Sequence, residues 1–295
     1  MIVRTLVLAL FALAGAAQAE RPAPSTHKLW PSGAPGSESR RAEPEQAQDY
    51  WVKNIHDPSL TIFPADPKNS NGASVVVMPG GGHRILVWTT EGTAVAQALN
   101  RMGITVFLLK YRLANEEGST YTVEGDAMAD VRRAVRWVRA NAATYAIDPA
   151  RVGVMGFSAG GELVSLLADN PAPAEAAPRD SVDRQSARPD FQILVFPGPR
   201  GVPAQAREKA PPAFITSGSL DACCAAPSVA LYEQLRKAGV SAELHMYADA
   251  DHAFNLGEQS NRLSILHWPD RLHDWLSDGG WLSPRRVPAP PPGKR

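Results

Sequence analysis

The chain has 295 residues, 44% of them hydrophobic, with 30 basic and 30 acidic side chains. Because these charges balance, the composition offers no electrostatic reason to expect binding to nucleic acid or to an anionic membrane surface. The length allows one large α/β domain or two small ones, and the hydrophobic fraction suits a globular core.

The N-terminal residues differ in character from the rest of the chain. Residues 1–4 are a short basic start, residues 5–14 are an apolar run too short to span a bilayer comfortably, and residues 17–19 read Ala-Gln-Ala. This pattern predicts a secretory signal peptide over residues 1–19, cleaved after Ala19, and therefore a periplasmic or secreted protein. No later segment is long and apolar enough to predict a membrane helix.

Buried strands and amphipathic helices alternate along most of the chain. Apolar, β-branched runs predict strands at 59–63, 74–78, 104–109, 152–157, 191–196, 213–216 and 242–247. Apolar residues at helical spacing predict helices at 91–101, 123–145, 227–238 and 262–276, and another helix begins after residue 158. This order predicts an α/β fold with a doubly wound, mostly parallel sheet and helices on both faces.

The predicted α/β domain spans residues 58–282. Residues 20–57 are rich in proline, charge and glutamine, and we expect them to wrap the surface. Residues 283–295 contain five prolines and are expected to form a disordered tail. The excursions at 170–189 and 197–212 are too short for a large cap domain, so we expect an open site.

The most informative segment is a glycine-flanked serine between a strand and a helix. Residues 156–160 read Gly-Phe-Ser-Ala-Gly and directly follow an apolar run. In this setting G-x-S-x-G is the nucleophile elbow, a sharp turn that holds the serine hydroxyl exposed. Side chains at Gly156 and Gly160 would collide with neighbouring backbone. The pattern predicts Ser158 as a nucleophile, the alternative being a serine that only caps the helix.

A serine nucleophile needs a base, and the base needs an acid that orients it. In this fold the chain order is serine, acid, histidine. His252 follows the last predicted strand in a polar loop, where α/β sheets place their chemistry. Asp221 follows the preceding strand and is the predicted acid, since Asp249 and Asp251 are too close in sequence to reach the far ring nitrogen easily. The other histidines after the serine lie in strand or helix patterns: His245, His267 and His273. Three further aspartates lie in or beside an earlier loop: Asp180, Asp183 and Asp190.

A glycine-rich loop, Pro79-Gly80-Gly81-Gly82-His83, follows the second predicted strand. It stands at the position of the oxyanion loop of esterases. We expect the N–H groups of Gly81, Gly82 and Ala159 to form an oxyanion hole for charge developing on a carbonyl oxygen. A phosphate-binding P-loop is excluded, because no lysine and Ser/Thr close the loop. No histidine or cysteine at metal spacing accompanies His83, so no metal is expected there. The protein itself supplies the predicted nucleophile, base and oxyanion donors, so no organic cofactor is expected either.

The two cysteines, Cys223 and Cys224, are adjacent. Export would permit a disulfide. Neighbouring Cα atoms lie about 3.8 Å apart across a trans peptide, below the usual disulfide range of roughly 4.4–6.8 Å. We therefore expect two buried thiols that pack as small hydrophobes, with a vicinal disulfide as the alternative.

Together these motifs resemble the α/β-hydrolase serine esterases, in particular their bacterial acetylxylan-esterase-like branch. The resemblance runs from about residue 58 to residue 282 and includes Lys110-Tyr111-Arg112-Leu113 beside the motifs above. It implies an acyl-enzyme mechanism and a small-molecule or oligosaccharide ester as substrate, with acetylated sugars or xylan fragments expected. The chain departs from the family at Glu162, often a histidine, in the sequence around His252, often Gly-His-Gly-Phe-Gly, and in the acid turn, which often has two aspartates.

Two other functions stay open. A serine peptidase of the prolyl-oligopeptidase type uses similar catalytic residues. That class usually carries a large propeller domain, for which the predicted segments of this chain leave no room. A non-catalytic binding protein can also use a hydrolase fold, and the loss of a triad residue would signal it. Among enzymes, an open site favours a small acyl group on a bulky alcohol.

Overall fold

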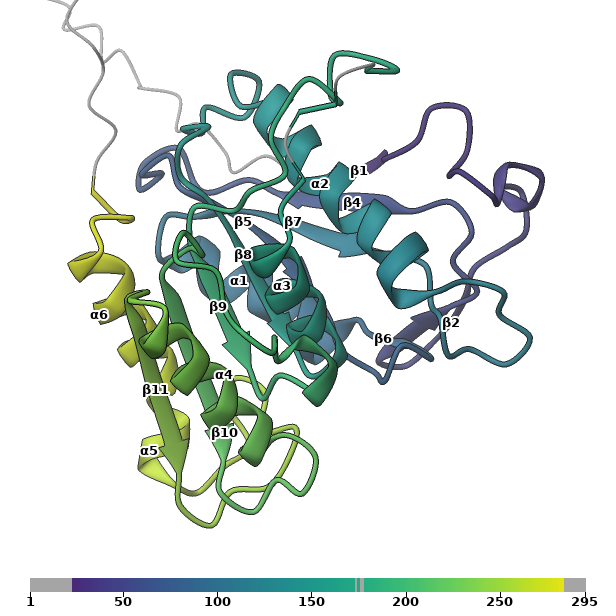
Figure 1. Cartoon of the computed structure of the whole chain (residues 1–295). Coiled ribbons are helices and arrows are strands. Elements are labelled where there is room, and N and C mark those ends of the chain that lie inside the picture. Colours follow the sequence, from purple (N-terminus) through teal and green to yellow (C-terminus); the bar gives the residue numbers. More distant parts are fainter. Residues whose placement is uncertain (1–22, 173, 176–177, 284–295) are drawn as a thin grey trace, which may run out of the picture.

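The computed structural model describes residues 23–172, 174–175 and 178–283. The predicted signal peptide and all but the first residue of the predicted tail lie outside the described residues. The fold is that of an α/β-hydrolase, as predicted, with a mostly parallel eight-stranded sheet between helices (Figure 1).

The main sheet has the strand order β1-β4-β7-β5-β8-β9-β10-β11. The strands are β1 (Ser25–Lys28), β4 (Ser59–Phe63), β5 (Ser74–Met78), β7 (Thr105–Lys110), β8 (Val152–Phe157), β9 (Gln192–Val195), β10 (Ala213–Gly218) and β11 (Ala242–Tyr247). Among the described strands of this sheet, the antiparallel pairs are β1 with β4 and β4 with β7, and the other pairs are parallel. All seven predicted strands are present. β5 and β8 are buried along their whole length, which explains their continuous apolar runs.

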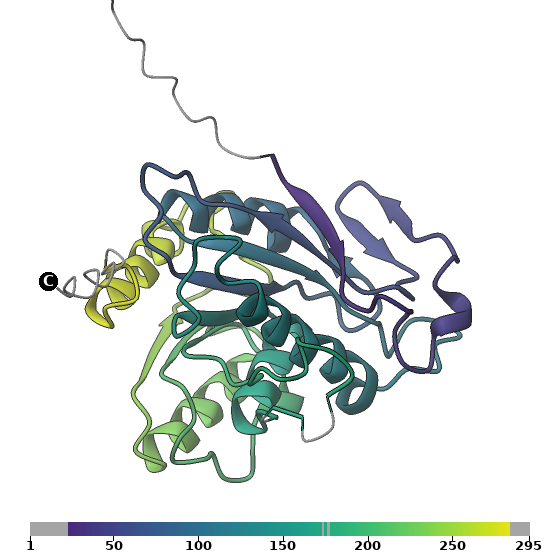
Figure 2. The same ribbon diagram turned by 90° about the horizontal axis from the view of Figure 1, so that it is seen from above.

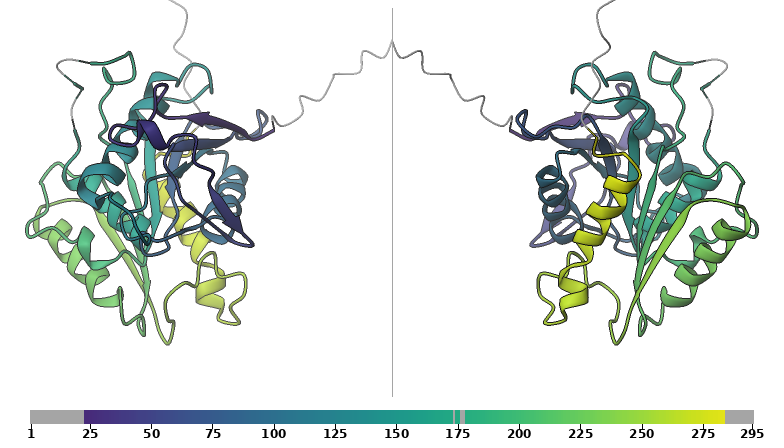
Figure 3. Two further views of the ribbon diagram at one scale, coloured as in Figure 1. Left: turned by 90° about the vertical axis from the view of Figure 1, so that its right-hand side faces the viewer. Right: turned by 90° about the vertical axis from the view of Figure 1, so that its left-hand side faces the viewer.

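Helices cover both faces of the sheet (Figure 3). They are α1 (Ala94–Arg101), α2 (Met128–Ala140), α3 (Ala159–Asp169), α4 (Ala225–Lys237), α5 (Leu263–Leu266) and α6 (Trp268–Asp278). Apolar residues of α2, α3 and α4 join one core cluster, and those of α1 and α6 join a second. The sheet therefore separates two hydrophobic cores. Shorter turns are η1 (Glu38–Arg40), η2 (Thr89–Thr93), η3 (Val123–Ala127) and η4 (Pro199–Gly201).

Three predicted helices differ from the observed ones. The predicted helix 91–101 begins within the π-helical turn η2, and regular α-helix starts only at Ala94. The predicted helix 262–276 is divided into α5 and α6 at His267, because Pro269 has no N–H to continue α5 and is accommodated in the first turn of a new helix. The predicted helix 123–145 begins with the π-helical turn η3 and ends at Ala140. Residues 141–146 continue as turns.

The N-terminal segment does more than wrap the surface. β1 adds an edge strand to the main sheet, and β2 (Gln46–Gln48), β3 (Trp51–Lys53) and β6 (Leu86–Val87) form a second, three-stranded sheet. Figure 2 shows these N-terminal strands, in purple and blue, at the opposite end of the molecule from the yellow helix α6.

A buried charged cluster fixes this segment to the domain. The Trp30 indole N–H donates to Asp130 Oδ1 of α2 at 2.9 Å. The Arg112 guanidinium donates to both oxygens of Asp130, at 2.9 Å each. All three side chains are buried, so each partner satisfies a charge or dipole that would otherwise be costly inside the protein.

Candidate active site

Four loops meet at one edge of the sheet. The glycine loop follows β5, Ser158 follows β8, Asp221 follows β10 and His252 follows β11. These strands are parallel to their neighbours in this part of the sheet, so their carboxyl ends lie on the same side. Residues distant in sequence therefore converge.

The tight turn at Ser158 requires glycine two residues before it and two residues after it, at Gly156 and Gly160. Ser158 has φ 49° and ψ −116°, a backbone conformation that costs energy for any residue with a side chain. A Cβ at Gly156 would lie 2.2 Å from the Gly160 carbonyl oxygen, and one at Gly160 would lie 2.0 Å from the oxygen of Met78. The tight elbow thus packs against the end of β5 and presents the serine hydroxyl at the start of α3.

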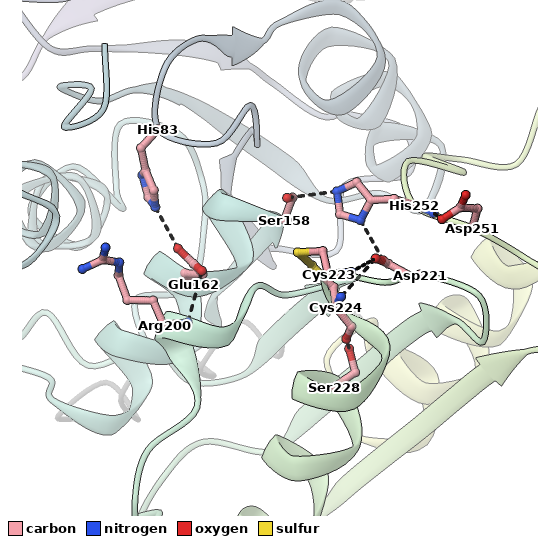
Figure 4. The surroundings of a disulfide bond; sticks show 10 residues. All are labelled: His83, Ser158, Glu162, Arg200, Asp221, Cys223, Cys224, Ser228, Asp251 and His252. Atoms are coloured by element: carbon pink, nitrogen blue, oxygen red, sulfur yellow. Dashed lines mark hydrogen bonds and ion pairs between the residues drawn. A yellow bond between two sulfur atoms is a disulfide. The ribbon is translucent and has the colours of Figure 1, made fainter. Parts of the chain in front are cut away.

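A chain of hydrogen bonds connects Ser158, His252 and Asp221 (Figure 4). His252 Nε2 lies 3.1 Å from Ser158 Oγ, and His252 Nδ1 lies 2.7 Å from Asp221 Oδ2. An ionised carboxylate only accepts hydrogen bonds, so Nδ1 carries the proton and donates it to Asp221. Nε2 is then free to accept from the serine hydroxyl, which is the arrangement a general base requires.

Asp221 is held by the turn that carries it. Its side chain is fully buried, and its Oδ1 accepts the backbone N–H groups of Cys223 and Cys224 at 3.0 Å each. The other aspartates considered make different contacts and do not bond the His252 ring. Asp251 accepts the backbone N–H of His252, Asp249 is exposed and pairs with Arg262, and the remaining three pair with arginines: Asp180, Asp183 and Asp190.

The expectation for the cysteines was wrong. Cys223 and Cys224 form a vicinal disulfide, with Cα atoms 3.7 Å apart. Cys224 is buried, whereas Cys223 is exposed and lines the cavity beside Ser158. The Cα distance typical of disulfides describes cysteines that are not neighbours, and here both backbone N–H groups turn toward one carboxylate. Among the described residues, Asp221, Cys223, Cys224 and His252 each have a possible metal-ligand atom within 4.8 Å of the others.

The glycine loop lies next to the elbow, but its first N–H is already used. Gly80 N donates to Glu91 Oε2 at 2.7 Å. In the part of the chain that the structure describes, the N–H groups of Gly81 and Gly82 have no protein acceptor. Ala159 is the first residue of α3, where a backbone N–H has no acceptor within the helix. Gly82 and Ala159 line the same cavity as Ser158.

Sequence reasoning missed Glu91, a buried carboxyl behind this loop. It lies in the π-helical turn η2, ahead of α1. A Cβ built on Gly80 would lie 2.9 Å from Glu91 Oε2 and 3.1 Å from the Ser158 Cβ, so the carboxyl is close to Ser158. Burial raises the pKa of Glu91 to about 7, although the Gly80 hydrogen bond opposes the rise. An acidic residue at the start of the predicted helix 91–101, shortly after the glycine loop, was the only signal in the sequence.

The cavity above Ser158 has a volume of about 570 Å³, and its lining is mostly apolar with a few polar side chains. Asn115, Glu162 and Arg200 contribute to it. Glu162 Oε2 lies 2.9 Å from His83 Nε2, and Glu162 Oε1 accepts the backbone N–H of Arg200 at 3.1 Å. Glu162, the departure noted in the sequence, therefore connects the glycine loop to the loop after β9. His83 is therefore hydrogen-bonded to a residue that lines the cavity.

Comparisons with known proteins agree with this architecture. A family model described as BD-FAE matches residues 60–192. The chain is 28% identical to an acetylxylan esterase from Xylanibacter ruminicola over 256 residues, which cover 76% of this chain and 48% of that protein. The chain thus spans about half the length of this curated relative.

Solved structures are similar over more of their length. An acetyl ester-xyloside bifunctional hydrolase from Caldicellulosiruptor lactoaceticus superposes with a TM-score of 0.73 and 26% identity, over 87% of this chain and 97% of that one. A thermophilic esterase from Thermogutta terrifontis superposes with a TM-score of 0.65 and 22% identity, over 82% and 96% of the two chains. The latter likeness concerns the fold alone.

Proposed function

The chain has the α/β-hydrolase fold and resembles bacterial acetylxylan esterases, and from this premise we propose that it is a secreted carboxylic ester hydrolase. Its proposed reaction removes acetyl groups from acetylated sugars or xylan fragments. The observation that carries the proposal is the hydrogen-bonded chain from Ser158 through His252 to buried Asp221 at a nucleophile elbow.

In the proposed first step, Ser158 Oγ attacks the ester carbonyl carbon. His252 Nε2 takes the hydroxyl proton, and Asp221 stabilises the imidazolium that forms while keeping the ring oriented. The negative charge moves to the carbonyl oxygen, where the N–H groups of Gly81, Gly82 and Ala159 would donate to it. The carbon–oxygen bond to the sugar then breaks, and His252 gives its proton to the leaving alcohol.

In the proposed second step, water replaces the alcohol. His252 takes a proton from the water, the hydroxide attacks the acyl carbon, and Ser158 leaves with the proton returned by the histidine. The products are acetate and the free enzyme. Nucleophile, base and donors all come from the protein, so the proposed reaction needs no metal or organic cofactor.

Two exposed polar side chains in the lining of the cavity support a sugar on the alcohol side. Asn115 and Arg200 are both exposed and can donate to sugar hydroxyls next to Ser158. Both oxygens of buried Glu162 already accept hydrogen bonds from the protein. Hydroxyl-rich substrates need such partners because a buried hydroxyl without one is costly. Among the described residues, no helix is long and apolar enough to cross a membrane.

An acyl-length series on nitrophenyl esters tests the proposal. A methylene that fits its pocket gains about 0.8 kcal/mol of apolar burial, whereas one that does not fit costs about 1–3 kcal/mol. We expect kcat/KM to fall from acetyl to butyryl and to be very low for octanoyl esters, and acetylated xylo-oligosaccharides to release acetate. A steady rise toward octanoyl would contradict the sugar-ester assignment, and no turnover of any ester would favour the non-catalytic alternative.

A further inference from the structure

The vicinal disulfide lies against the residue that orients the proposed base. Both bridged cysteines donate their backbone N–H groups to Asp221 Oδ1, while Asp221 Oδ2 faces His252. Figure 4 shows the sulfur atoms beside Asp221 and close to the Ser158–His252 pair. Any change at these sulfurs therefore occurs within the hydrogen-bond network of the site.

The same four residues carry atoms of the kind that bind metal ions, and in the closed state these atoms already lie close together. Two sulfurs, one imidazole nitrogen and one carboxylate oxygen, all within 4.8 Å of one another, come from Cys223, Cys224, His252 and Asp221. Thiolates with an imidazole and a carboxylate suit four-coordinate Zn²⁺ or Cd²⁺. In the closed disulfide neither sulfur is a thiolate, and the sulfurs cannot serve as such ligands.

We propose that reduction of the Cys223–Cys224 bridge converts the acid turn into an inhibitory site for a thiolate-binding divalent cation, and that the closed bridge keeps the cation out. An external dithiol or phosphine reductant supplies the two electrons that open the disulfide, two protons complete the thiols, and the reductant is oxidised. The cation then displaces both thiol protons to solvent and binds the two thiolates, Asp221 and His252.

Inhibition follows from the tautomer of the histidine. A cation on His252 Nδ1 removes the hydrogen bond to Asp221, and the neutral ring then carries its proton on Nε2. Nε2 can no longer accept the proton of Ser158 Oγ, which lies 3.1 Å away. The cation therefore blocks the base without covering the serine. This effect on activity rests on the proposed function, whereas the binding itself does not.

The exposure of one cysteine supports the proposed order, in which the bridge is reduced first and the cation binds afterwards. Cys223 is exposed and lines the cavity with Ser158, so a reductant can reach one sulfur of the pair. Cys224 is buried beneath it, and its carbonyl accepts the hydroxyl of buried Ser228 at 2.7 Å. The start of α4 is thus held in place while the exposed end of the bridge opens.

The test compares oxidised and reduced full-length chain. The protein is reduced with a phosphine, desalted without oxygen, checked for two free thiols per chain, and checked by circular dichroism for native structure. Cd²⁺ is then titrated while thiolate–cadmium ultraviolet absorption and hydrolysis of nitrophenyl acetate are followed. We expect the reduced chain to bind one Cd²⁺ and to lose its activity in parallel, the oxidised chain to do neither, and a chelator to restore activity.

Variants separate the outcomes. Reduced Ser158→Ala, which should have no esterase activity, should still bind one Cd²⁺, so a failure of the proposed function is distinguishable from a failure of the metal site. The double variant Cys223→Ser, Cys224→Ser keeps the backbone donors to Asp221 and should show the same activity with and without Cd²⁺. The proposal is overturned if the reduced, folded chain binds no Cd²⁺, if the oxidised chain or the double variant is equally inhibited, or if reduction alone unfolds the protein.

Discussion

Replacing Glu91 by glutamine changes one titrating group while keeping its hydrogen bond. The side-chain amide oxygen of the glutamine in Glu91→Gln can still accept the backbone N–H of Gly80, which lies 2.7 Å from Glu91 Oε2 in the wild type. The substitution removes only the charge. Any change in the pH dependence of stability therefore reports the ionisation of Glu91 in the folded state.

The sign and size of the effect follow from burial. The pKa of Glu91 rises from 4.5 to about 7 in the folded protein, so the folded state keeps a proton that the unfolded state has lost between these values. Stability from this group is greatest below pH 4.5 and is lost as pH rises to about 7. A difference of about 2.5 pKa units corresponds to roughly 3 kcal/mol.

Urea unfolding at a series of pH values measures how the contribution of Glu91 to stability depends on pH. The free energy of unfolding of Glu91→Gln, relative to the wild type, should increase by roughly 3 kcal/mol between pH 4.5 and about pH 8. Glu91→Ala is the matched control. It also removes the charge, but it leaves the Gly80 N–H unpaired and should cost about 1–3 kcal/mol more than glutamine at every pH. Curves for wild type and Glu91→Gln that run parallel across this range would refute the reasoning.

Three further substitutions test other parts of the account. Asp221→Asn should lower kcat about 10³–10⁴-fold by favouring the wrong imidazole tautomer, and a larger loss in Asp251→Asn would identify a different acid. Gly160→Ala places a Cβ 2.0 Å from a carbonyl oxygen at the end of β5, so the melting temperature should fall with a loss of about 1–3 kcal/mol or more, and a wild-type melting curve would contradict the elbow geometry. Asp130→Asn removes the buried charge that accepts two hydrogen bonds from the Arg112 guanidinium and leaves Asp126 as its remaining carboxylate partner. It should cost roughly 3 kcal/mol in urea unfolding, whereas a loss near zero would mean that the cluster does not bear on stability.

Much of the fold could be predicted because burial on both faces leaves a clear signal in the sequence. The strands through Val75 and Val154 are continuous apolar runs, and the structure places both in the middle of the sheet. β1 escaped prediction because its four residues, Ser25–Lys28, are all exposed and show no apolar alternation. It pairs with β4 at the sheet edge through its backbone, and backbone pairing of this kind does not depend on side-chain pattern.

The residues of the candidate site likewise fall into those that the sequence could predict and those that it could not. Ser158, Asp221 and His252 follow strand ends in a known order, so topology alone suggested that they converge, and the distances agree with that expectation. Glu91 and the cysteine bridge depend on local turn geometry. A π-helical turn aims Glu91 inward, and the turn after Asp221 brings two neighbouring cysteines together. Neither turn has a residue pattern that predicts it.

Covalent labelling with a fluorophosphonate, read by intact mass and peptide mapping, tests directly whether Ser158 is the nucleophile. We expect one phosphonyl group per chain, on Ser158, with labelling slowed by an acetyl ester. Labelling should be absent from Ser158→Ala, whose kcat should fall about 10⁴–10⁶-fold. A label on another residue, or a Ser158→Ala variant that keeps more than about a tenth of the activity, would contradict the assignment of Ser158 as the nucleophile.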